Sequence, residues 1–187
     1  MELDDIIDAI YTMPETSKTL LKANLTEVSF PKGHLLISAN KIENTIYLIK
    51  KGIVRAYSDT ENSQITFWFG KEGDTVISMK SYVANQKSYD NIELLEDCKL
   101  YAIDKSVIEK LYNTDIHIAN WGRKFAEKEL LSVEERFISR QFKTATERYA
   151  ELMQNTPYLL QRVSLGHIAS YLGIIPASLS RIRAEIK

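Results

Sequence analysis

The sequence is poor in cysteine and lacks a long apolar run, and both absences limit what the protein can be. Its single cysteine, Cys98, cannot form an internal disulfide, and one thiol is typical of a reducing cytoplasm. No run of about 18 apolar residues could cross a bilayer. The acidic N-terminus lacks the basic start and apolar core of a secretory signal. We therefore expect a cytoplasmic protein with no membrane partner.

Net charge is also nearly absent, at −1, which by itself argues against a nucleic-acid-binding protein. The charges are unevenly placed, however. From Arg136 to the C-terminus eight Lys and Arg stand against three Asp and Glu, whereas the preceding part has an acidic excess. This asymmetry predicts an acidic body with a basic end that faces phosphates. Ordinary variation of surface charge is the alternative.

Residues 25–103 have the pattern of a β-rich domain, preceded by helical spacing in residues 2–24. Short β-type runs alternate with turn signals such as Lys51-Gly52. About eight strands at this spacing predict an antiparallel sandwich or jelly roll. The expected strands are Leu25–Phe30, His34–Ile37, Thr45–Lys50, Ile53–Ser58, Ile65–Phe69, Asp74–Ile77, Ile92–Leu95 and Lys99–Ile103.

A long amphipathic helix is predicted from about Asp115 to Phe142, after a shorter helix capped by Asp104. It would be about 40 Å long, too long for one small domain to cover. Such a helix usually pairs with another, most simply its copy in a second chain. Burial against the sheet is the alternative. The candidate dimerisation residues are Ile118, Trp121, Phe125, Leu130, Val133 and Phe137.

The last 25 residues, Val163–Lys187, read as two short helices joined by a tight turn. Ser164 can cap the first helix, Gly173 suits the left-handed turn, and Pro176 suits the first position of the second helix. Apolar residues fall on one face of each helix, while Ser178, Ser180, Arg181 and Glu185 share the opposite face of the second. A compact helix-turn-helix with a partly basic face fits a DNA major groove. An ordinary helical hairpin that closes a domain would have similar spacing.

These segments divide the chain into three parts. Residues 1–114 form the β-roll, 115–143 the long helix and linker, and 144–187 the helix-turn-helix domain, which opens with a capping box from Thr144 to Glu147. The fold class is α+β: an N-terminal antiparallel β-roll or jelly roll with flanking helices, a long dimerisation helix, and a C-terminal truncated winged helix-turn-helix.

The order of these parts resembles the Crp/Fnr family of bacterial transcription regulators over nearly the whole chain. The resemblance implies that the β-roll senses a small molecule, the long helix dimerises, and the last helix reads DNA. The matching motifs are Lys32-Gly33, Lys51-Gly52-Ile-Val-Arg55, Leu95-Glu-Asp-Cys98, Thr146-Glu-Arg148, Ile168-Ala-Ser-Tyr-Leu-Gly173 and Leu179-Ser-Arg-Ile-Arg183.

The cyclic-nucleotide pocket departs from the family pattern. Nucleotide-binding relatives use a Gly-Glu pair and, ten residues after the Glu, an Arg-Ser/Thr pair. Those places fall on Ile77, Ser78, Ser88 and Tyr89. An Arg–phosphate contact has no neutral replacement of similar strength, so we expect no binding of cyclic AMP. One cysteine and three scattered histidines supply neither an iron–sulfur nor a haem site, so no cofactor and no metal is predicted, and any effector is unknown.

The second helix departs as well. By the resemblance, the DNA-contacting positions are Ile175, Pro176, Ala177, Ser178, Ser180 and Arg181. Pro176 and Ala177 stand where relatives that read guanine-containing sites have Arg and Glu, and Arg181 matches a base-reading Arg. Ile175 at the cap position lacks a side-chain acceptor. Lys187 ends the sequence just past this helix, so the usual wing is expected to be largely missing.

These observations predict a homodimeric transcription regulator that binds a palindromic operator in double-stranded DNA, with RNA polymerase as a further candidate partner. Two alternatives stay open. An enzyme on a cupin-like barrel would need clustered histidine and carboxylate metal ligands, but the expected strands hold one His. A sensor or scaffolding protein whose truncated helix-turn-helix no longer binds DNA would have the same motifs. Because the histidine cluster of a cupin-like metal site is missing, the expectation is a protein without enzymatic activity.

Overall fold

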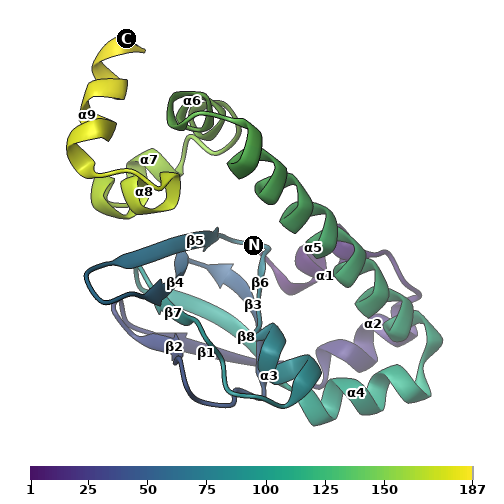
Figure 1. Ribbon diagram of the computed structural model, residues 1–187. Helices are drawn as coiled ribbons and strands as arrows, with labels where there is room; N and C mark the ends of the chain where they lie inside the picture. The colour runs from purple at the N-terminus through teal and green to yellow at the C-terminus, as the bar shows by residue number, and fades with distance from the viewer. Residues whose placement is uncertain (187) are drawn as a thin grey trace. The chain divides into compact units, whose positions relative to one another are not determined.

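The computed structural model describes residues 1–186 (Figure 1). The chain divides into two compact units. Unit 1 contains Met1–Ala56 and Phe69–Leu130. Unit 2 contains Tyr57–Trp68 and Leu131–Lys187. The hairpin segment Tyr57–Trp68 therefore belongs with the C-terminal helices, although its strands continue into unit 1 at both ends.

The β-roll is built from two four-stranded sheets, with orders β1-β8-β3-β6 and β2-β7-β4-β5. In the first sheet β8 pairs antiparallel with both β1 and β3, for example Tyr101 with Glu27 and with Leu48. The expected antiparallel roll is confirmed, with strands β1 Thr26–Phe30, β2 Leu35–Ile37, β3 Thr45–Lys51, β4 Val54–Asp59, β5 Gln64–Gly70, β6 Thr75–Val76, β7 Asn91–Leu94 and β8 Cys98–Asp104.

Helices cover one face of the first sheet. Alternation along β3 and β8 places Ile46, Leu48, Tyr101 and Ile103 on that face, where they pack against apolar residues of α1, α2, α4 and the start of α5. The bounds are α1 Leu3–Ile10, α2 Glu15–Lys22, α3 Met79–Ala84, α4 Lys105–Thr114 and α5 Ile116–Phe142. No helix among residues 1–186 combines the length and apolarity needed to span a bilayer.

Gly52, in the turn between β3 and β4, has a φ of +117°, which L side chains rarely adopt. A Cβ there would overlap the Sγ atom of Cys98 and lie 3.0 Å from its Cβ. The Lys51-Gly52 signal thus reflects both a backbone and a packing requirement.

The N-terminal part of α5 differs from the predicted dimer interface. Ile118 and Trp121, expected in the dimer seam, are 0% and 5% exposed and belong to the core of unit 1. The Nε1 of Trp121 donates to the carbonyl of Ile7, 3.1 Å away. These two residues are therefore excluded from an interface on the surface of α5.

Unit 2 contains the rest of α5 and four shorter helices: α6 Ala145–Asn155, α7 Leu159–Arg162, α8 Leu165–Leu172 and α9 Pro176–Glu185. The predicted capping box is present, since the Thr144 side chain accepts from the Glu147 N–H and the Glu147 carboxylate accepts from the Thr144 N–H at 2.7 Å. The apolar spacing of the sequence did not predict the four-residue helix α7 or the six-residue helix α3 of unit 1.

Candidate functional site

The two last helices form the turn that their sequence predicts. The Ser164 hydroxyl accepts from the His167 N–H at the start of α8, and Gly173 ends α8 with φ 70° and ψ 32°. Pro176 then occupies the first turn of α9. Ile168, Ala169 and Leu172 of α8 and Leu179 and Ile182 of α9 are buried. The apolar faces therefore hold the two helices together and leave the opposite face of α9 to solvent.

The predicted DNA-contacting residues lie along α9 and its cap. Ile175 is 66% exposed and forms no side-chain cap, as expected. Pro176, Ala177, Ser180 and Arg181 are exposed and Ser178 is half-buried. The Ser180 hydroxyl donates to the Pro176 carbonyl of its own helix at 3.1 Å.

Arg181 could instead have paired with Glu185, four residues on. Within residues 1–186 no ion pair joins Arg181 and Glu185, although a separation of four residues along a helix would allow one. The guanidinium of Arg181 is exposed and free to meet an acceptor outside the chain.

Two of the four predicted effector positions, Ser78 and Ser88, are held by local hydrogen bonds. Ser78 and Ser88 are each 2% exposed. The Ser78 hydroxyl caps α3 and donates to the Ser81 hydroxyl at 3.0 Å, while the Ser88 hydroxyl donates to the carbonyl and carboxylate of Asp90. Their polar atoms therefore have partners within the segment.

The two other predicted positions differ in burial. Ile77 is half-buried and packs against the helix-side core, while Tyr89 is 64% exposed. The four predicted effector residues thus differ in their surroundings: two buried serines, one half-buried residue against the core and one exposed tyrosine.

A partly buried ion pair lies on neighbouring strands of the second sheet. Arg55 of β4 is 2% exposed, and its guanidinium donates to the carboxylate of Glu93 of β7 at 2.7 Å. Arg55 appeared in the sequence only as the end of the Lys51–Arg55 motif. Its burial could not be read from residue type, because arginine is usually exposed.

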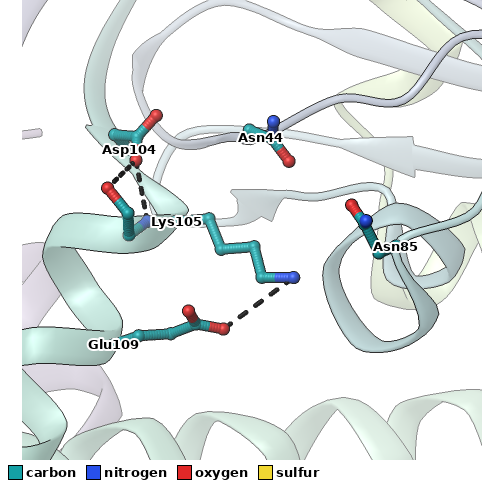
Figure 2. A pocket seen from close by; sticks show the side chains of 6 residues that line it. Asn44, Asn85, Asp104, Lys105 and Glu109 are labelled. Atoms are coloured by element: carbon teal, nitrogen blue, oxygen red, sulfur yellow. Dashed lines mark hydrogen bonds and ion pairs between the residues drawn. The ribbon is translucent and has the colours of Figure 1, made fainter.

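A polar cavity of about 550 Å³ lies elsewhere in unit 1, at the N-terminal end of α4 (Figure 2). Figure 2 shows the Lys105 side chain reaching towards Glu109. The Lys105 Nζ lies 3.8 Å from the Glu109 Oε1, and the Asp104 carboxylate accepts hydrogen bonds from the N–H and the hydroxyl of Ser106. Asn44 and Asn85 also line the cavity. It includes none of the four predicted effector residues. Among the described residues no cluster of metal-ligating side chains is found.

Comparison with known proteins agrees with this architecture. Residues 27–115 match the family model of the cyclic nucleotide-binding domain. Among curated proteins, no sequence matches the chain.

Solved structures match the chain almost from end to end. FixK2 from Bradyrhizobium japonicum is 21% identical, with a TM-score of 0.71, covering 87% of this chain and 84% of its own. The global regulator CLP of Xanthomonas campestris is 15% identical, with a TM-score of 0.73, and the match covers 92% of this chain and 91% of CLP. A protein from Eubacterium rectale described as a regulator of the Crp/Fnr family is 18% identical, with a TM-score of 0.72, and the match covers 91% of this chain and 82% of that protein. The chain has the Crp/Fnr fold.

In this Crp/Fnr fold the C-terminal part of α5 carries a line of exposed apolar side chains. Leu130, Val133 and Phe137 are 71%, 51% and 60% exposed and recur at helical spacing. Phe125, half-buried, stacks on Trp121 with ring centroids 6.3 Å apart. We call Leu130, Val133 and Phe137 the α5 stripe.

Arg148 holds the helices of unit 2 together, a role that sequence reasoning missed. Its guanidinium donates to the carbonyl of Leu172 at the end of α8, at 2.7 Å, and to the carbonyl of Lys143 after α5. A cation at the C-terminus of a helix is favoured because the last carbonyls are unpaired and the helix dipole is negative there. Arg148 was visible in the sequence only as the last residue of a family motif.

Proposed function

We propose that the protein is a transcription regulator that binds specific sites in double-stranded DNA as a homodimer and does not respond to cyclic AMP. The observation that carries the proposal is the exposed face of α9. It belongs to a compact helix-turn-helix within a Crp/Fnr fold, and on it Arg181 extends towards solvent.

DNA recognition by α9 would combine contacts to base edges with contacts to the sugar–phosphate backbone. The guanidinium of Arg181 matches the O6 and N7 acceptors of guanine in the major groove. Ser178, Ser180 and the cap residues Ile175, Pro176 and Ala177 would lie nearer the sugar–phosphate backbone or pack against base methyl groups. Phosphate contacts position a helix, whereas base contacts give it specificity.

A twofold dimer is supported by the α5 stripe, which leaves large apolar side chains in water in the single chain. Two copies of α5 would cover each other's stripes, as in a coiled coil. Because a twofold dimer presents two copies of α9, its operator would be palindromic, with half-sites about one helical turn apart. RNA polymerase would then be a candidate partner of the DNA-bound dimer.

The absence of a response to cyclic AMP is supported by the segment from Ser78 to Ser88. Its two buried serines have hydrogen-bond partners already, and neither could replace the charge of an arginine on a cyclic phosphate. The fold also serves other signals: the related CLP is described as responsive to cyclic di-GMP. Any effector of this protein would differ from cyclic AMP in its binding groups.

The decisive experiment for DNA binding uses Arg181→Ala on a site enriched by the wild-type protein from random DNA. At fixed salt, we expect a loss of about 1–3 kcal/mol on the enriched site and a smaller loss on a scrambled one. Arg183→Ala, on the flank of the same helix, is the comparison and should weaken both sites alike. Equal losses on both sites with Arg181→Ala would contradict base reading. If the wild type enriches no site, the protein is instead a sensor or scaffold.

The effector proposal is tested separately by calorimetry. Titration of the full chain with cyclic AMP and with cyclic GMP should give no binding heat. Micromolar binding of either nucleotide would overturn the interpretation of Ser78 and Ser88.

A further inference from the structure

Strand β5 lies at the edge of its sheet, in the order β2-β7-β4-β5. An edge strand has backbone N–H and C=O groups on its outer side that no neighbouring strand can pair. A single side chain forms hydrogen bonds with two such groups in the hairpin segment of unit 2, the N–H of Thr66 and the carbonyl of Gln64.

That side chain is Ser170 of α8. Its hydroxyl accepts from the Thr66 N–H at 2.9 Å and donates to the Gln64 carbonyl at 2.6 Å. One hydroxyl therefore takes the place of a strand partner for two backbone groups. Thr66 is 0% exposed, so its N–H would be costly to leave unpaired.

Ser170 is not needed to hold the helix-turn-helix together. On α8 the buried side chains Ile168, Ala169 and Leu172 form the face that packs within the motif. Ser170 lies roughly on the opposite face, since successive residues are turned by about 100° along a helix. The contact also leaves Ser180 and Arg181 of α9 exposed.

We infer that Ser170 is a positioning residue for DNA binding: it fixes the helix-turn-helix on the β4–β5 hairpin with the reading face of α9 outward. This inference rests on the proposed DNA-binding function. Two half-sites can be read together only when both copies of α9 are held at a defined spacing. A helix-turn-helix that is released from its hairpin keeps its charge and its phosphate contacts. The spacing between the two copies of α9 in the dimer is then no longer defined.

The test compares Ser170→Ala with Ser170→Thr, which keeps the hydroxyl. Ser29→Ala is the matched control, because Ser29 is exposed on β1 and has no side-chain hydrogen bond within residues 1–186. Ser170→Ala should weaken binding to the enriched palindromic site about 5- to 100-fold, the effect of losing two neutral hydrogen bonds. Binding to a scrambled duplex should change less than about twofold, since it depends mainly on charge. Ser170→Thr and Ser29→Ala should bind like the wild type.

Amide hydrogen exchange tests the contact without DNA. The peptide that contains Thr66 should exchange faster in Ser170→Ala than in the wild type, and Ser170→Thr should restore its protection. Failure of the wild type to enrich a site, with this exchange effect present, would reject the DNA-binding proposal but not the contact. Unchanged exchange would reject the contact itself. Tighter DNA binding by Ser170→Ala, or equal losses on both duplexes, would overturn the positioning role.

Discussion

The α5 stripe can be tested by placing a carboxylate in it. Phe137 is 60% exposed in the single chain. Full burial of a large apolar side chain gains about 1.5–3 kcal/mol, so covering the exposed part of Phe137 should gain about 1–2 kcal/mol per chain. A twofold interface contains the residue twice, which makes about 2–4 kcal/mol for the dimer.

Phe137→Glu removes this gain and also places two carboxylates in the apolar interface, where each loses hydration. We therefore expect the dimer dissociation constant to rise by at least about 100-fold, since about 1.4 kcal/mol corresponds to a tenfold change. Sedimentation velocity over a micromolar concentration series measures the shift from dimer to monomer.

Phe142→Glu is the control for this substitution. Phe142 is 79% exposed and lies on the same helix, but it is turned by about 140° from Phe137. We expect Phe142→Glu to remain a dimer. If both variants dissociate equally, or if Phe137→Glu dimerises like the wild type, the stripe is not the interface. A wild-type monomer with an intact α5 would reject the dimer altogether.

Three further predictions concern the stability of unit 2, measured by denaturation of the full chain. Arg148→Met should lower it by about 1–3 kcal/mol, because the carbonyl of Leu172 loses a charged donor, and an unchanged midpoint would contradict that role. Ile175→Ser should raise it by about 1 kcal/mol by supplying the missing cap of α9, and no gain would mean that the cap is already satisfied. Hydrogen bonds from the N–H and hydroxyl of Thr144 hold the pKa of Glu147 below its ordinary value. A carboxyl whose pKa is lowered in the folded state contributes stability above its unfolded pKa and loses it as the pH falls through the folded pKa. Stability should therefore decrease below about pH 4.5, and this part of the decrease should be absent in Glu147→Gln.

The order of elements could be predicted because it depends on local signals. Each expected strand is a short β-type run bounded by turn residues, and the pattern of alternation survives in the sheets. The helix-turn-helix was equally readable, since Ser164, Gly173 and Pro176 act on the backbone next to them. The short helix α3 was missed because six residues are too few for a helical period to be recognised.

The candidate DNA-reading face could also be predicted, because apolar spacing along α9 decides which residues are buried. The interface on α5 could be predicted only in part. Its apolar residues share one spacing along the sequence, but Ile118 and Trp121 belong to the core of unit 1, and Leu130, Val133 and Phe137 are exposed.

The sequence by itself thus determined the order of the elements, the turn of the helix-turn-helix and the outer face of α9, since each depends on residues a few positions apart. Only the tertiary structure decided which polar and apolar side chains find distant partners. Trp121 meets a carbonyl 114 positions away, and Ser170 meets backbone groups 104 and 106 positions away. Such contacts depend on which distant segments the fold brings together. The type of a side chain and its neighbours in the sequence do not indicate which segment that will be.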